Sequence, residues 1–340
     1  MTMPLPVILA SSVLHAAGAS VVAHYGRYRS WPNEALLLDE PLAFAEAKTS
    51  RLRRIYTMAG ESLWDGPTVF REAVARHGGI QLSEERRAAL AYPISMLLWG
   101  ELGAWIVSAE LAERLEDPDA RMAASSQVFD EARHFYVLRD YLALLHVPVP
   151  RIDPYFAAAA RSLLATRDLT LKLFAMQILA EGSAQAIFDF LSKSDVEPVL
   201  CDILPYIARD EARHVGLGIL HLPERLERMT PRERRRLSRK IHTIGDLLAA
   251  AQIRCVEHYQ VLGLDPRELL RRADGLLTNL AEKLGRVPGT DHFWFRVDDP
   301  RLPAYQAKLD LVLPRPGTPA SGLARVLREL VDLGARTLPA

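Results

Sequence analysis

Apolar residues recur at helical spacing along most of the chain, and prolines and glycines fall mostly between the apolar stretches. This pattern is typical of amphipathic helices, whereas the alternation expected of strands is nearly absent. The pattern therefore predicts an all-α protein. We expect helices over residues 5–24, 41–60, 67–77, 84–115, 120–146, 154–192, 196–221, 231–263 and 266–285, and a last short one near 320–335.

Two of the expected helix starts carry capping signals. Thr230 is followed by proline and stands three residues before Glu233, as in a capping box. Asp265 is likewise followed by proline and stands three residues before Glu268, so we expect it to cap the next helix. No linker is long or polar enough to divide the chain, so we expect one domain over residues 1–340. Its parts are N-terminal helices in 1–83, a bundle core in about 84–221, and C-terminal helices with a loop-rich tail in 222–340.

The composition narrows the class of protein. The 340 residues are 49% hydrophobic and 25% charged with a formal net charge of zero, the profile of a soluble globular protein. This balance argues against a nucleic-acid partner, and two cysteines are too few for a disulfide framework or a cysteine-based metal site. The apolar N-terminal stretch lacks the basic start of a signal peptide and is too broken for a membrane span, so we expect a cytoplasmic protein without a membrane partner.

The sequence Asp-Glu-Ala-Arg-His occurs twice, at 130–134 and at 210–214. Residues three apart on a helix share a face, so each copy presents a carboxylate and an imidazole side by side. Glu101 precedes Glu131 by 30 residues, and Glu181 precedes Glu211 by 30.

Turn-like sequences lie midway between the members of each pair, near positions 116 and 196, and each contains a proline. In an antiparallel hairpin, residues equidistant from the turn lie at the same height, here roughly 20 Å from it at 1.5 Å per residue. Two such hairpins form a four-helix bundle with four Glu and two His at mid-height. Two divalent cations would balance the four buried carboxylates, as in dinuclear carboxylate sites. The predicted metal ligands are Glu101, Glu131, His134, Glu181, Glu211 and His214.

The residues beside these ligands have a predicted role of their own. A metal-bound histidine usually donates its other ring N–H to a carboxylate. We expect Asp210 to hold His134 and Asp130 to hold His214, with Arg133 and Arg213 either supporting the two acids or forming ordinary surface salt bridges.

The paired motif, with Glu101 and Glu181 each 30 residues before a Glu-x-x-His, resembles that of the ferritin-like dinuclear iron oxygenases. It is most similar to the motif pair of the bacterial arylamine N-oxygenases, and it also resembles acyl-carrier-protein desaturases and the small subunit of class I ribonucleotide reductase. The resemblance covers residues 101–214. It implies a ferritin-like four-helix bundle core with additional N- and C-terminal helices. Ile207 stands where the arylamine enzymes have an extra His ligand, and Leu138 stands where the reductase has its radical Tyr.

The resemblance also implies a reaction. We expect two iron ions, with Mn/Fe as an alternative, dioxygen as co-substrate and an external electron donor. The reaction would be hydroxylation, N-oxygenation or desaturation of a small organic or carrier-protein-bound substrate. An iron-handling ferroxidase and a radical-generating subunit are the alternatives, and a homodimer is allowed.

Helical spacing from Glu101 and Glu181 suggests three residues that line the substrate pocket, and the position of the arylamine enzymes' extra His adds a fourth. The expected pocket residues are Trp105, Gln177, Gln185 and Ile207. The basic cluster at 232–240 is either a solvated helix start or a docking patch for an acidic carrier protein. His242 is one histidine that could supply a further ligand from a fifth helix.

Overall fold

The computed structural model describes residues 47–284, 313 and 322–338. Every regular element in these ranges is a helix, so the all-α prediction is confirmed. The helix expected at 5–24 lies outside the described residues, as does the tail at 285–312. Ala45–Ala340 forms one compact unit, and the inclusion of the preceding residues in the same domain stays a prediction.

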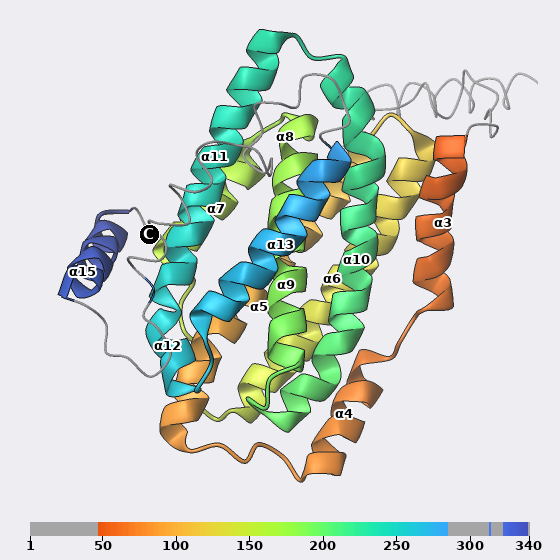
Figure 1. The fold of residues 1–340 in the computed structure, drawn as a ribbon. Coiled ribbons are helices and arrows are strands. Elements are labelled where there is room, and N and C mark those ends of the chain that lie inside the picture. Colours follow the sequence, from red (N-terminus) through yellow and green to blue (C-terminus); the bar gives the residue numbers. More distant parts are fainter. Residues whose placement is uncertain (1–46, 285–312, 314–321, 339–340) are drawn as a thin grey trace, which may run out of the picture. The chain divides into compact units, whose positions relative to one another are not determined.

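Four long helical segments form the core, and Figure 1 shows their arrangement. The helices α5 (Glu84–Arg114) and α6 (Pro118–Leu144) form one antiparallel hairpin. The second hairpin pairs α10 (Pro198–Glu227) with a composite helix. That helix runs through α8 (Leu169–Leu173), η1 (Phe174–Ala180) and α9 (Glu181–Ser192).

The two hairpin turns lie where the sequence predicts them. Asp117 caps α6 by accepting hydrogen bonds from the backbone N–H groups of Asp119 and Ala120, and a proline follows it. Glu197 caps α10 in the same way, and its buried carboxylate also accepts from the Tyr141 hydroxyl at 2.9 Å. Because both turns are fixed by caps, the residues equidistant from them stay level across each hairpin.

The prediction of a single helix over 154–192 is wrong in one respect, because the helix is interrupted between α7 (Pro154–Ala165) and α8. Thr166 is extended, and the Asp168 carboxylate accepts from the backbone N–H groups of Thr170 and Leu171 in the first turn of α8. Local side-chain capping therefore competes successfully with continuation of the helix.

Two other boundaries also differ. The helix expected over 231–263 splits at Cys255 into α11 (Pro231–Arg254) and α12 (Val256–Val261), while the predicted capping box of Thr230 and Glu233 is present. Helix α10 passes the predicted end at 221 because Leu222 and Leu226, four residues apart, are both fully buried and hold its last turns on the bundle.

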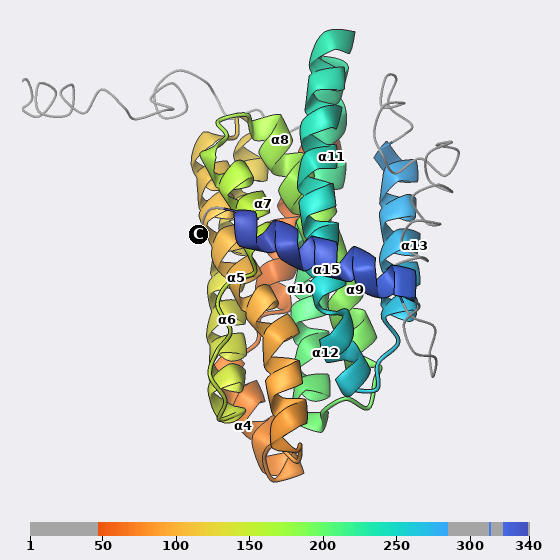
Figure 2. The same ribbon diagram turned by 90° about the vertical axis from the view of Figure 1, so that its left-hand side faces the viewer.

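The remaining helices cover the core. On one side, α3 (Ala47–Glu61) and α4 (Gly66–His77) pack on α6 and α10. On the other, α13 (Pro266–Leu284) packs on α9, and α11 packs on α7. The last described helix, α15 (Gly322–Thr337), crosses over α11 and α7 (Figure 2).

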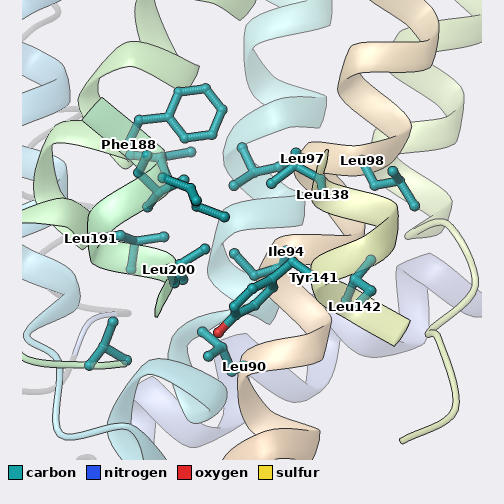
Figure 3. Close-up of a cluster of buried hydrophobic side chains, with 14 of the residues drawn as sticks. Leu90, Ile94, Leu97, Leu98, Leu138, Tyr141, Leu142, Phe188, Leu191 and Leu200 are labelled. Carbon is teal, nitrogen blue, oxygen red and sulfur yellow. The ribbon is translucent and has the colours of Figure 1, made fainter. Parts of the chain in front are cut away.

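Large apolar side chains fill the end of the bundle at the turn between α9 and α10, where α5 begins and α6 ends (Figure 3). Tyr141 and Leu138 of α6 lie in one cluster with Ile94 of α5, Phe188 of α9 and Leu200 of α10, and each of these five side chains is fully buried. Burial of one such side chain contributes roughly 1.5–3 kcal/mol. The contacts therefore lock both hairpins together.

Helix α5 is long and apolar enough to cross a membrane, by length and composition alone. In the fold it lies within the bundle, with 61% of its most apolar window buried. Packing inside the core accounts for this composition, and the cytoplasmic location stays a prediction.

Close packing of α10 against η1 gives a test of the fold. A Cβ added at Gly218 would lie 2.6 Å from the Cβ of Gln177, whereas one added at Gly216 would meet only the Ile55 side chain, at 3.6 Å. We expect Gly218→Ala to destabilise the protein by about 1–3 kcal/mol. Gly216→Ala on the same helix should be neutral or stabilising by up to about 1 kcal/mol. Chemical denaturation followed by circular dichroism measures both, and equal midpoints would contradict this packing.

Candidate metal centre

The six predicted ligand side chains converge at the centre of the bundle. Glu101 comes from α5, Glu131 and His134 from α6, Glu181 from the first residue of α9, and Glu211 and His214 from α10. Each is at most 5% exposed.

These side chains form two groups whose ligand atoms all lie within 4.8 Å of one another. Position A consists of Glu101, Glu131, His134 and Glu211. Position B consists of Glu131, Glu181, Glu211 and His214. Because Glu131 and Glu211 belong to both, the two groups have the form of adjacent sites joined by bridging carboxylates.

Both imidazoles turn Nδ1 toward the carboxylates. His134 Nδ1 lies 3.3 Å from Glu101 and 3.2 Å from Glu211, and His214 Nδ1 lies 2.8 Å from Glu211 and 3.2 Å from Glu131. Nδ1 is therefore the nitrogen available to an ion at either position.

The opposite ring nitrogen of each histidine faces an aspartate of the other hairpin. Nε2 of His134 lies 3.2 Å from Asp210, and Nε2 of His214 lies 3.3 Å from Asp130. This is the crossed arrangement expected from the sequence. An N–H donated from Nε2 to the aspartate leaves the Nδ1 lone pair directed at the centre.

Arg133 and Arg213 join the two aspartates rather than forming surface salt bridges. Arg133 contacts Asp210 at 2.7 Å as well as Asp130, and Arg213 lies 2.8 Å from both acids. The guanidinium side chains are 7% and 5% exposed. The charges of the two arginines thus balance those of the two aspartates. The arginines therefore supply no counter-charge to the four glutamates.

The carboxylates of the centre fit metal ions. Burial raises the pKa of Glu101 and of Glu181 well above the usual range, so protons neutralise these groups when no cation is bound. Glu131 Oε2 and Glu211 Oε1 are buried without a hydrogen-bond partner. Oxygen and imidazole donors suit iron and manganese, and two divalent ions would supply the partners and the charge that these atoms lack.

Two residues that sequence reasoning missed contact the centre. Trp64, in the turn between α3 and α4, donates from Nε1 to Asp210 at 2.7 Å, and its ring stacks near that of His134. No local pattern places Trp64 there, because it lies 146 residues from Asp210. Gln127 could have been found, since it stands four residues before Glu131 on the same helical face.

The segment before Glu181 is a π-helix, η1, and the backbone N–H of Glu181 bonds to the Met176 carbonyl at its end. The extra residue per turn rotates Glu181 relative to the helix that precedes it. Such π-helical turns occur frequently at functional sites.

A cavity of about 220 Å³ reaches the centre from one side. Glu101 and Glu181 form part of its wall. Most of its other lining is apolar and includes Leu97 and Ala104 of α5, Phe156 of α7, Met176 of η1, Ile187 of α9, Leu248 of α11, Val256 of α12 and Leu277 of α13.

None of the four residues predicted to line a pocket borders this cavity. Trp105 is 42% exposed, because Glu101 lies at the edge of the buried stripe of α5, which runs through Ala104 and Ser108, and Trp105 lies on the other side of Glu101. Gln185 is half-buried. Gln177 and Ile207 are fully buried, but they lie inside the bundle rather than on the cavity side. His242 belongs to neither ligand group among the described residues.

Comparison with known proteins supports the fold. No protein-family model and no curated protein matches this sequence. The similar solved structures include two point variants of an R2-like ligand-binding oxidase with an aerobically reconstituted Mn/Fe cofactor. Each is 14% identical with a TM-score of 0.50, and the matches cover 71% and 75% of this chain and 95% of each of those chains. The likeness establishes the fold, so the predicted ferritin-like bundle with additional helices is confirmed.

The buried Asp–Arg network generates a stability prediction. Burial alone would raise the pKa of Asp210, but hydrogen bonds from His134 and Trp64 and the charge of Arg213 lower it overall. Asp210→Asn removes one charge from this network and should cost about 3–5 kcal/mol. Asp202→Asn, which breaks a partly exposed ion pair with Arg76, should cost at most about 1 kcal/mol. Urea unfolding of the metal-free proteins measures both, and similar losses would contradict this view of the network.

Proposed function

We propose that this protein is a dinuclear metal-dependent oxidoreductase that uses dioxygen to oxidise an apolar organic molecule. One observation carries the proposal. Two carboxylate and histidine groups share Glu131 and Glu211, and two of their other carboxylates form the wall of a largely apolar cavity.

The residues of positions A and B would hold two transition-metal ions, both iron or one manganese and one iron as in the two similar structures. When bound, these ions supply the redox chemistry that reduces dioxygen. Glu131 and Glu211 would serve both positions, Glu101 would complete position A and Glu181 position B, and each histidine would offer Nδ1. The crossed aspartates hold the Nε2 protons and keep the rings oriented.

The cavity would bind and orient the substrate. Its lining has few polar atoms and includes the carboxylates of Glu101 and Glu181, so it favours an uncharged apolar group at the metal end. Apolar walls also exclude water from the reaction. Hydroxylation then follows the balance substrate–H + O₂ + 2e⁻ + 2H⁺ → substrate–OH + H₂O, and desaturation releases a second water in place of the hydroxyl product. An external donor supplies the two electrons.

The finer reaction type also has support. Ile207 is buried apolar core, and His242 lies in neither ligand group, so position A has three carboxylates and one histidine among the described residues. The extra histidine ligand of the arylamine enzymes thus has no counterpart at position 207 or at His242. The missing histidine favours hydroxylation or desaturation at a C–H bond, or an N-directed oxidation of another type, over a strict conversion of amines to nitro compounds.

The route of substrate delivery is a further part of the proposal. Helix α11 carries the basic cluster at 232–240 near its start, and its later residues Leu248 and Gln252 line the cavity. An acidic carrier protein that binds the cluster would therefore present its substrate beside the cavity. We propose a cytoplasmic setting, and a homodimer is compatible with this arrangement.

Metal loading tests the proposal. Wild type should bind two metal ions per chain by elemental analysis, and Glu131→Ala or His214→Ala should lose at least one ion and all dioxygen-dependent turnover. His77→Ala changes a histidine paired with Asp202 far from the centre and should keep both ions. Two ions and full turnover in either ligand variant would sink the assignment.

Filling the cavity separates oxidation of an organic substrate from iron handling. Ala184 lines the cavity, whereas Ala143 of α6 is exposed. Ala184→Leu should keep both ions but lose most substrate-dependent dioxygen consumption, and Ala143→Leu should lose none. A ferroxidase would consume dioxygen with iron(II) alone, and filling the cavity would leave that activity intact.

A further inference from the structure

The candidate metal centre is built from a repeat at an offset of eighty residues. The equivalent pairs are Glu101 and Glu181, Asp130 and Asp210, Glu131 and Glu211, Arg133 and Arg213, and His134 and His214. If the rest of the centre followed this repeat, positions A and B would have equivalent surroundings.

The residues one turn before the glutamates break the repeat. Gln177 precedes Glu181 by four residues, but the equivalent residue before Glu101 is Leu97. Gln127 likewise precedes Glu131, while its equivalent before Glu211 is Ile207. One end of the centre therefore has two amides where the other end has two aliphatic side chains.

The two amides form a buried chain of hydrogen bonds that ends on position B. Gln127 Nε2 donates to Glu131 Oε1 at 2.8 Å and to Glu181 Oε1 at 2.7 Å. Gln177 Nε2 donates to Gln127 Oε1 at 2.8 Å, which fixes the orientation of the Gln127 amide. Both glutamines are at most 1% exposed.

Position A has no equivalent support of its own, because the Glu131 oxygen that accepts from Gln127, Oε1, is the one that lies 3.2 Å from His214 Nδ1 of position B. The terminal carboxylate of position A, Glu101, is contacted by His134 Nδ1 at 3.3 Å, and no amide reaches it from any residue in the described ranges. Trp64 strengthens position A only indirectly, because it bonds to Asp210, which in turn contacts His134 Nε2.

We infer that Gln127 is a positioning residue that makes the two metal positions inequivalent, so that position B binds its ion more tightly than position A. This inference rests on the proposed dinuclear function. One amide group uses both of its hydrogens on two different ligands of position B and holds them in place before the ion arrives. Hydrogen-bonded partners of metal ligands typically contribute 10–100-fold in metal affinity.

The experiment isolates each position by removing the histidine of the other. Manganese(II) alone is the probe, because free and protein-bound Mn(II) are distinguished by electron paramagnetic resonance. His134→Ala leaves position B with its full ligand set, and His214→Ala leaves position A. We expect His134→Ala to bind Mn(II) more tightly than His214→Ala.

The Gln127 variant is then added to each background. Gln127→Met keeps the length of the side chain without its donors, and it should lower Mn(II) affinity 10–100-fold in the His134→Ala protein and leave it unchanged in the His214→Ala protein. Ile207→Leu, at the equivalent place on α10, should leave both affinities unchanged. An equal loss in both backgrounds, or no loss in the His134→Ala protein, overturns the inference.

A second variant keeps the test decisive if Gln127→Met does not fold. Gln177→Met removes only the donor that orients Gln127, and a smaller loss confined to position B is expected; a loss confined to position A, or none, would refute the role. Failure of wild type to bind any Mn(II) would instead refute the proposed dinuclear function, so the two failures are distinguishable.

Discussion

The rest of the structure depends on four glutamates that converge in the interior of a helical bundle. Their carboxylates are buried, and the two aspartates beside them already have two arginines as counter-charges. Burial of unpaired charge costs far more than any one helix contact contributes, so the centre needs either protons or cations. Burial raises the pKa of Glu101 and of Glu181, which favours their protonated forms in the metal-free protein. Metal cations that displace these protons would pair with the buried carboxylates, so the cost of burying the carboxylates on folding would favour metal binding.

That constraint explains why the helix ends are so firmly fixed. A shift of one residue in either hairpin would rotate a glutamate by about 100° and leave a carboxylate in the apolar core. Asp117 and Glu197 set the two turns, which lie at opposite ends of the bundle, with side-chain caps. The cluster around Tyr141 holds the hairpins together at the Glu197 end. Gly218 lets η1 approach α10 closely enough for Gln177 to meet Gln127. Turn chemistry and apolar packing thus set the height and rotation at which the polar centre forms.

Local rules were sufficient to predict the part of the centre that repeats. The spacing of Glu131 and His134 on one helix, and the equal distances to a turn, depend on helix geometry alone, and the structure brings all six side chains together. Residues placed by tertiary packing could not be predicted in this way. Trp64 reaches Asp210 from another part of the chain, and the side of the bundle on which the cavity opens is set by α11 and α13. Trp105 shows the same limit within one helix, since the rotation of α5 against its neighbours decides which side of Glu101 is buried.

The repeat and its interruptions account for different properties of the centre. Identical Asp-Glu-Ala-Arg-His segments give each position the same histidine, the same bridging carboxylate and the same crossed aspartate. Such symmetry builds a site for two ions but gives no reason for the ions to differ in affinity or for a substrate to approach from one side. The differences come from residues outside the segments. Gln127 bonds to a ligand of position B, whereas its counterpart in the repeat, Ile207, is apolar core. Leu97 lines the cavity, whereas its counterpart, Gln177, lies inside the bundle. The same departures from the repeat therefore give position B support from buried amides and position A aliphatic neighbours, while the cavity reaches the terminal carboxylates of both positions, Glu101 and Glu181.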